Sequence, residues 1–198
     1  MTFELEDVET ETLLALEAEG HGIFPRPALL ATIQDKFTQK QFLQNAGIPT
    51  SEFVDMPIPD RAAFARFGYP LVQKARRGGY DGRGVVVMHD DSAFPQHLPV
   101  DGFVERFVSA DKELAVLVAR SLGGECRVYP TVEMRFHARG NVLDMLVAPA
   151  AIDADTARRA ERLAVRTVEA MDGTGVFGIE MFLTDGGDLL VKEMAPRT

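Results

Sequence analysis

The sequence has 198 residues and a formal net charge of −9, and 46% of its residues are hydrophobic. A chain of this length and composition can bury its own core, which excludes a disordered tail, a collagen-like chain and a disulfide-rich miniprotein. Its single cysteine, Cys126, cannot form an internal disulfide, so we expect a reducing compartment, the cytoplasm. An acidic chain with no long apolar stretch is expected to bind neither nucleic acid nor a membrane.

The first hundred residues mix short strands with helices. The predicted elements, in chain order, are a strand at 2–5, a helix around 13–16, a strand at 23–25, helices from 27 to 46, a strand at 52–54, a helix at 60–67 and strands at 70–74 and 85–88. Asp35 is placed to cap a second helix within 27–46, and Gly47 with Pro49 ends that helix.

Beyond residue 101 the sequence is mostly β. Strands are predicted at 103–107, 113–120, 127–132, 142–148, 176–183 and 188–194, with one amphipathic helix at 155–171. Because strands and helices do not alternate as regular βαβ units, we predict an α+β fold. A boundary near residue 100 divides it into two mixed subdomains.

A glycine-rich loop separates the predicted strands at 70–74 and 85–88. Four of the seven residues at 78–84 are glycine, which lets the backbone approach a ligand closely and present its N–H groups. Arginines surround the loop and Lys74 ends the strand before it, which suits a polyphosphate. A hairpin with solvated arginines and an ordinary strand-end lysine is the alternative. The glycine spacing excludes the dinucleotide fingerprint, and the lack of a Gly-Lys pair excludes a Walker A loop.

Two carboxylates lie on the last two predicted strands. If Gly186 and Gly187 form a two-residue hairpin loop, Glu180 lies directly opposite Glu193. Like charges in opposed positions destabilise a sheet, and Mg²⁺ shared with phosphate oxygens would compensate. A different register, or solvated side chains, is the alternative. In a regular strand Lys192 points to the opposite face from Glu193 and does not reach such a metal.

Two further glutamates, Glu105 and Glu113, bracket an apolar connection. Such a connection could hold an adenine against backbone groups and a ribose on one carboxylate, although glutamates at strand ends are common. The four histidines show no metal-ligand spacing, and one cysteine supports no zinc site. A serine-hydrolase elbow is absent from the sequence.

Taken together, these segments resemble the ATP-grasp superfamily, and within it the 5-(carboxyamino)imidazole ribonucleotide synthases, the ATPase subunits of phosphoribosylaminoimidazole carboxylase. The matching stretches cover nearly the whole chain and include residues 33–40, 47–50, 68–74, 77–84, 105–108, 112–114, 129–130, 178–182 and 193–197. The stretches Gly-Gly-Tyr-Asp-Gly-Arg-Gly and Glu-x-Ala-Pro-Arg are specific to this branch of the superfamily.

The resemblance implies an ATP-grasp fold in which two subdomains, 32–100 and 101–198, enclose an ATP cleft, after a remnant of an N-terminal domain and linker at 1–31. It implies carboxylation of 5-aminoimidazole ribonucleotide with bicarbonate and ATP, by way of carboxyphosphate. The products are 5-carboxyaminoimidazole ribonucleotide, ADP and phosphate, in de novo purine biosynthesis. A homodimer is implied for the complete enzyme.

The resemblance also implies a role for particular residues. ATP phosphates would be bound by Lys36, Lys74 and a flap made of Gly79, Tyr80, Asp81, Gly82, Arg83, Gly84 and Val85. The adenine would be held by Glu105, Arg106, Phe107 and Val108, the ribose by Glu113, and Mg²⁺ by Glu180 and Glu193. The imidazole ribonucleotide would contact Tyr80, Asp81, Arg83 and Arg197.

The sequence departs from the family in three places. Lys192 stands where the family has Asn before the second metal-binding Glu, and Glu133-Met134 stands where Glu-Asn is usual. The chain also begins at the family's last N-terminal-domain strand and stops before a C-terminal domain, so we expect an ATP-grasp domain with little or no turnover alone. Two alternatives stay open: another ATP-grasp carboxylate–amine ligase, which the Tyr-Asp-Gly-Arg stretch argues against, and a nucleotide-binding module without turnover.

Overall fold

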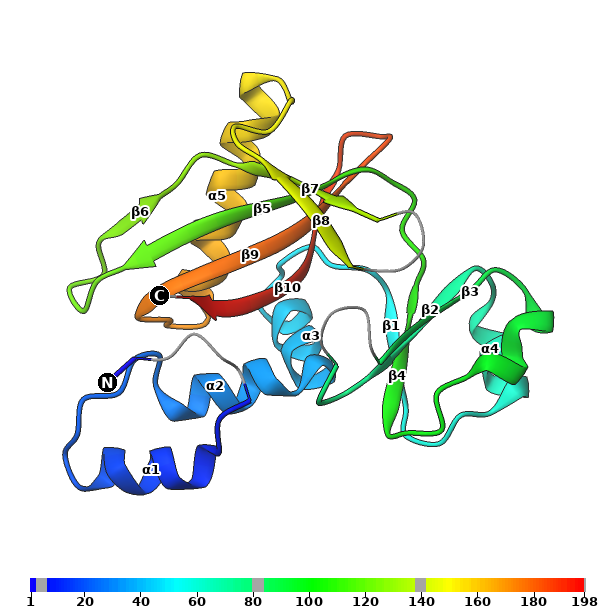
Figure 1. The fold of residues 1–198 in the computed structure, drawn as a ribbon, viewed down its shortest axis with the longest axis horizontal. Helices are drawn as coiled ribbons and strands as arrows, with labels where there is room; N and C mark the ends of the chain where they lie inside the picture. Colours follow the sequence, from blue (N-terminus) through cyan, green and yellow to red (C-terminus); the bar gives the residue numbers. More distant parts are fainter. Residues whose placement is uncertain (3–6, 80–83, 138–141, 198) are drawn as a thin grey trace.

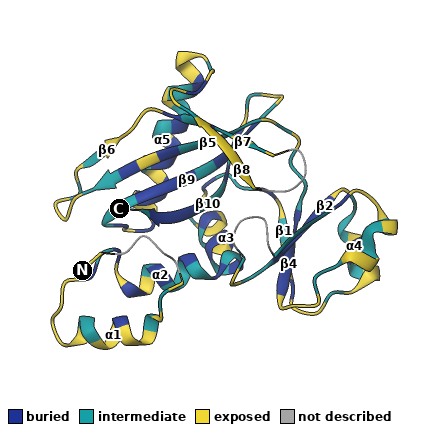
Figure 2. Cartoon of the chain, viewed as in Figure 1, coloured by how far each residue is buried: buried dark blue, intermediate teal, exposed yellow. Residues whose placement is uncertain are grey.

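The computed structural model describes residues 1–2, 7–79, 84–137 and 142–197, and it confirms an α+β fold (Figure 1). A smaller four-stranded sheet and a larger six-stranded sheet lie side by side, and both are antiparallel. Buried residues follow the central strands of both sheets, whereas α1 and α4 expose much of their surface (Figure 2). Within the described part of the chain, every helix is too short or too polar to cross a membrane.

Three helices open the chain, α1 (Thr10–Ala18), α2 (Pro27–Gln34) and α3 (Lys36–Asn45). Asp35 separates the last two because its backbone is extended, and its carboxylate accepts a hydrogen bond from the Thr38 N–H at 3.0 Å, as predicted. The predicted strand at 2–5 falls mostly outside the described residues, and Thr2 forms one parallel bridge with Phe24.

The smaller sheet has the strand order β1-β4-β2-β3. Its strands are β1 (Phe53–Met56), β2 (Leu71–Ala75), β3 (Val85–Met88) and β4 (Gly102–Arg106). One face packs on α4 (Arg61–Phe67) and on a 3₁₀ helix (Asp91–Gln96) that the sequence did not predict. The β2–β3 hairpin around the glycine-rich loop is confirmed. Because β4 pairs with β1 and β2, the smaller sheet extends past the subdomain boundary expected at residue 101.

The larger sheet has the order β10-β9-β5-β7-β8, with β6 paired to β5. Its strands are β5 (Ala110–Arg120), β6 (Cys126–Val128), β7 (Val132–Phe136), β8 (Leu143–Val147), β9 (Gly175–Thr184) and β10 (Leu189–Arg197). Helix α5 (Ala154–Ala170) covers one face, with Leu163 in the same core as Met181. The single strand predicted at 127–132 is wrong: β6 and β7 are separate, with Pro130, which has no N–H to donate, between them.

The β9–β10 hairpin places Glu180 opposite Glu193 as predicted, but for a different reason. The Thr184 N–H donates to the Asp188 carbonyl at 2.9 Å, so the loop has three residues rather than two, and Leu189 pairs with Leu183. That register alone would misalign the glutamates. A β-bulge at Lys192 shifts the pairing by one residue and restores the opposition.

Candidate functional site

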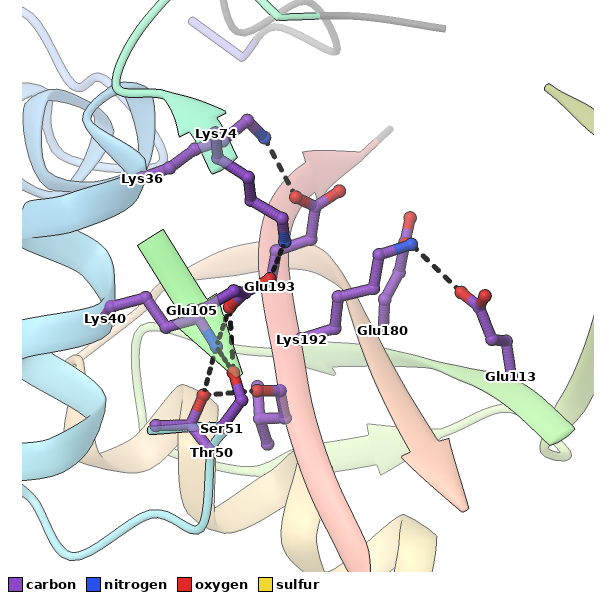
Figure 3. Close-up of polar contacts among 11 residues, drawn as sticks. Lys36, Lys40, Thr50, Ser51, Lys74, Glu105, Glu113, Glu180, Lys192 and Glu193 are labelled. Carbon is purple, nitrogen blue, oxygen red and sulfur yellow. Dashed lines mark hydrogen bonds and ion pairs between the residues drawn. The ribbon is translucent and has the colours of Figure 1, made fainter. Parts of the chain in front are cut away.

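Eight charged side chains meet where α3 and the smaller sheet approach the larger sheet (Figure 3). We call them the charge cluster; they are Lys36 and Lys40 of α3, Lys74 of β2, Glu105 of β4, Glu113 of β5, Glu180 of β9, and Lys192 and Glu193 of β10. The cluster formally carries four positive and four negative charges. It therefore brings together, from both halves of the chain, residues that the sequence proposed for phosphates, ribose and metal.

Lys36 joins the two sheets at one side of the charge cluster. Its Nζ lies 2.9 Å from Glu193 Oε2, while its backbone N–H donates to the Arg76 carbonyl at 2.9 Å, beside the glycine-rich loop. The preceding Asp35 pairs with the Arg76 guanidinium at 2.8 Å. The start of α3 is thus fixed to the end of β2, which holds Lys36 in place.

Glu105 is the centre of a buried ion triad. Its two carboxylate oxygens lie 2.5 Å from Lys74 Nζ and 2.8 Å from Lys40 Nζ, and Ser51 donates a hydrogen bond at 2.8 Å. Only 3% of the Glu105 side chain is exposed. Burial raises the pKa of Glu105, but the charges of Lys74 and Lys40 outweigh it, so the pKa falls to about 2. Glu105 is therefore a fixed anion that supports Lys74.

Lys40, which had no predicted role, is as buried as its partner Glu105. Its ammonium also donates to Thr50 Oγ1 at 2.6 Å and to Ser51 Oγ at 2.7 Å. Burial lowers the pKa of Lys40, and Glu105 counteracts this effect. The available signal was its spacing: a lysine four residues after Lys36 lies on the same face of a helix.

Lys192 lies among the carboxylates of the larger sheet, and its predicted position on the opposite face is wrong. Its Nζ is 3.0 Å from Glu113 Oε2 and 3.2 Å from Glu180 Oε2. The bulge explains the difference, because two residues of the bulged strand then oppose Glu180. Figure 3 shows the ammonium between the two glutamates.

The two opposed glutamates have different acidities. Burial, and next the charge of Glu193, raise the pKa of Glu180. Burial acts on Glu193 in the same direction, but Lys36 and Lys192 outweigh it and lower its pKa to about 2. A cation placed between Glu180 and Glu193 would therefore relieve a repulsion that the fold itself creates.

The glycine-rich loop is described only at its two ends, because Tyr80, Asp81, Gly82 and Arg83 lie outside the described residues. The Ala75 N–H donates to the Gly84 carbonyl at 2.8 Å, and Gly84 has a φ of +75°. A Cβ at Gly84 would lie 3.2 Å from the Cα of Gly79, so the loop is closed tightly at its base. The base of the loop follows Lys74 directly.

Three other residues predicted for the site lie outside the charge cluster. Arg106 donates to the carbonyls of Phe67 and Gly68 at 2.8 and 2.9 Å, so its side chain closes α4 rather than joining the charge cluster. The ring of Phe107 contacts that of His89. Arg197 packs across Gly178 of β9, on the sheet face that also carries Glu180.

A surface pocket lies on the other side of the larger sheet, against α5. It is lined by Pro49, Arg159, Arg162, Leu163, Arg166, Thr184, Asp188, Leu189 and Leu190. Arg159 and Arg166 use their guanidinium groups to bind the carbonyls of Gly187 and Gly47, so they connect α5 to two loops. The members of the charge cluster do not line this pocket.

Comparisons with known proteins agree with this fold. The ATP-grasp domain family matches residues 41–198. Phosphoribosylaminoimidazole carboxylase of Schizosaccharomyces pombe is 40% identical over all of this chain and 36% of its own length. The crystal structure of N5-carboxyaminoimidazole ribonucleotide synthetase from Thermotoga maritima has a TM-score of 0.87 and 41% identity, over 99% of this chain and 50% of that chain.

A further solved structure is N5-carboxyaminoimidazole synthase from Aspergillus clavatus, in complex with ADP and 5-aminoimidazole ribonucleotide. It has a TM-score of 0.89 and 31% identity, over 99% of this chain and 52% of that chain. The chain thus spans about half the length, or less, of these relatives. Because the family match covers most of the chain and the fold agrees over nearly all of it, the chain belongs to the ATP-grasp family.

Proposed function

We propose that this chain is the ATP-grasp part of a 5-(carboxyamino)imidazole ribonucleotide synthase. Such an enzyme uses ATP and bicarbonate to carboxylate the exocyclic amine of 5-aminoimidazole ribonucleotide in purine biosynthesis. The observation that carries the proposal is the charge cluster, in which lysines of α3 and of the smaller sheet converge with glutamates of both sheets. Two relatives support the substrate assignment: a phosphoribosylaminoimidazole carboxylase, 40% identical over all of this chain, and an N5-carboxyaminoimidazole ribonucleotide synthetase, 41% identical over 99% of it.

The phosphates of ATP would lie against Lys36, Lys74 and the loop from Gly79 to Val85. Both lysines lie at the base of that loop and close to carboxylates that hold them in position. Phosphoryl transfer needs cations that neutralise charge as it develops on the transferred group, and positioned ammonium groups supply them. Bound ATP would therefore bridge the two sheets, at the place where Lys36 already connects them.

The nucleoside would extend from the phosphates along the segment that joins the sheets. We assign the adenine to the segment from Glu105 to Val108 and the ribose to Glu113. In this assignment the Glu105 side chain acts as the partner of Lys74 and Lys40, and the adenine contacts come from the residues after it. The subdomain boundary would then lie between Arg106 and Ala110, so that the adenine sits at the junction.

Mg²⁺ fits the pair Glu180 and Glu193. Mg²⁺ is usually bound through one or two carboxylates together with phosphate oxygens of the substrate. Within the described ranges, no group of three or more His, Cys, Asp or Glu side chains could hold a metal alone, so the nucleotide would have to complete the coordination. Burial and the charge of Glu193 raise the pKa of Glu180, so a cation bound between the two carboxylates would be favourable. When bound, the metal would neutralise charge on the phosphates.

The chemistry needs two displacements. A bicarbonate oxygen attacks the γ-phosphorus of ATP, ADP leaves, and carboxyphosphate forms. The exocyclic amine then attacks the carboxyphosphate carbon, phosphate leaves, and the amine loses a proton. We assign the binding of the imidazole ribonucleotide to Tyr80, Asp81, Arg83 and Arg197. Of these, Arg197 lies on the same sheet face as Glu180.

The test is phosphate release from ATP by the purified chain, measured with bicarbonate alone and with bicarbonate plus 5-aminoimidazole ribonucleotide. We expect bicarbonate-dependent release that the ribonucleotide increases. The rate should be low, because this part makes up about half of the related proteins or less. Release that depends on a different amine acceptor would identify another ATP-grasp ligase. Binding of ATP without release under any condition would indicate a nucleotide-binding module.

Two further expectations accompany this proposal. The complete enzyme would act in the cytoplasm, where the single thiol of Cys126 stays reduced. It would act as a homodimer on small-molecule substrates. Sedimentation of the complete enzyme would test the second expectation.

A further inference from the structure

Lys192 occupies an unusual place in the β9–β10 hairpin. It is the bulged residue: Val191 pairs with Met181 and Glu193 pairs with Glu180, and no residue of β9 lies in register with Lys192. In such a bulge, two consecutive side chains are presented to one residue of the neighbouring strand. Its side chain therefore enters the charge cluster instead of leaving the sheet on the other face (Figure 3).

The Lys192 ammonium has the surroundings of a bound cation. It contacts one oxygen of Glu113 at 3.0 Å and one of Glu180 at 3.2 Å, and it lies 5.0 and 5.8 Å from the ring centres of Phe136 and Phe182. About a fifth of the side chain is exposed. Two carboxylates and two aromatic faces around one positive charge are a favourable, largely enclosed environment for it.

The Lys192 ammonium also balances the negative charges of Glu113 and Glu180. Glu193 is already paired with Lys36, so removing Lys192 would take away the ammonium that Glu113 and Glu180 share. The two carboxylates would then lie close together without the positive charge that now contacts both of them.

We propose that Lys192 is a built-in cation that replaces a divalent metal ion between Glu113 and Glu180. The chain would then bind its nucleotide with one divalent ion fewer than a Lys192→Asn variant, whose neutral amide frees Oε2 of Glu113 and Oε2 of Glu180 for a metal. The other oxygen of Glu113 stays available to the ribose in both proteins. This inference rests on the ATP site proposed above. It adds that Lys192 determines how many divalent ions bind together with the nucleotide.

The test counts bound metal ions. Mn²⁺ replaces Mg²⁺, and its free concentration is measured by electron paramagnetic resonance in the presence of the chain and a saturating non-hydrolysable ATP analogue. We expect about one Mn²⁺ per bound nucleotide for the wild type and for Lys192→Arg, which keeps the charge, and about two for Lys192→Asn. Two ions in the wild type, or equal numbers in the wild type and Lys192→Asn, would overturn the proposal.

A second measurement separates this proposal from the ATP site. Without nucleotide, Mn²⁺ should raise the melting temperature of Lys192→Asn and Lys192→Met more than that of the wild type, since only in these variants do Glu113 and Glu180 lack the ammonium they share. If the wild type binds no ATP analogue, the proposed function fails, and this melting experiment still decides the role of Lys192. If the neutral variants do not fold, Mn²⁺ should restore their folding, and failure to do so would contradict the proposal.

Discussion

Glu105 is the most enclosed carboxylate of the charge cluster, and it allows two lysines to lie beneath the proposed phosphate site. A buried ion pair gains little over an apolar contact when intact, but removing one partner leaves an uncompensated buried charge. Here one carboxylate serves two ammonium groups, those of Lys40 and Lys74. The position of Lys74 therefore depends on Glu105, to which the sequence analysis gave a role only toward the adenine.

Replacing Glu105 by Gln should destabilise the fold by about 3–5 kcal/mol, because Lys40 and Lys74 lose their counter-ion in a buried place. Glu52→Gln is the matched control, since Glu52 lies just before the neighbouring strand and its one ion pair, with Arg106, is at the surface. That change should alter stability by less than about 1 kcal/mol. Urea unfolding of both variants makes the comparison, and equal losses would contradict the buried triad.

The same carboxylate predicts a pH dependence. Its folded pKa is about 2, below the ordinary value of 4.5, so it stabilises the fold at pH values above about 4.5 and stops doing so as the pH falls toward 2. The difference in unfolding free energy between the wild type and Glu105→Gln should therefore shrink over this range. Unfolding curves at pH 7, 4.5 and 3 measure it, and a constant difference would show that Glu105 is not held as an anion.

At the scale of elements, the β9–β10 hairpin shows what the sequence could and could not specify. The two strands were predictable from apolar patterning and two adjacent glycines. The three-residue loop and the bulge at Lys192 were not predictable, because both depend on how the hairpin packs against the rest of the chain. The longer loop and the bulge each shift the pairing by one residue, and the two shifts cancel at Glu193. Lys192 lies within the bulge, so its side chain is on the other face from the predicted one.

In the other elements too, features encoded by local sequence were predictable and features that depend on tertiary packing were not. Helices with clear caps were predicted well: Asp35 and Asp60 both accept hydrogen bonds from the first turn of the helix that follows them. The 3₁₀ helix at Asp91–Gln96 lacks an apolar period that could predict it. Of the charge cluster, Lys40 had no role predicted from the sequence, because a lysine on a helix is usually solvated, and Lys192 was predicted on the wrong face of its strand.

Gly102 of β4 lies close to the backbone of β2. A Cβ on Gly102 would lie 2.5 Å from the carbonyl oxygen of Lys74, which no side chain tolerates without a backbone shift. Gly102→Ala should therefore cost about 1–3 kcal/mol and displace Lys74. In Gly186→Ala the nearest atoms lie 3.7 Å away, so stability should barely change. Thermal unfolding distinguishes them, and two equally stable variants would exclude this close approach.

At the scale of the whole molecule, α3 connects the two sheets. The ring of Phe37 packs against Phe53 and Phe103 of the smaller sheet. On the other side, the Gln39 amide bonds both the N–H and the carbonyl of Met194 in β10, at 2.8 and 3.0 Å. The ion pair between Lys36 and Glu193 lies beside these contacts. A ligand bound at the charge cluster would therefore stabilise both sheets together.

Ligand-dependent melting tests whether residues of both sheets bind one ATP. A non-hydrolysable ATP analogue with Mg²⁺, at about a hundredfold excess over its Kd, should raise the melting temperature of the wild type by about 5–10 °C. Lys74→Met in the smaller sheet and Glu193→Gln in the larger one should each lose most of that shift. Glu169→Gln, on the exposed side of α5, should keep it. A shift that survives either of the first two changes would contradict the account.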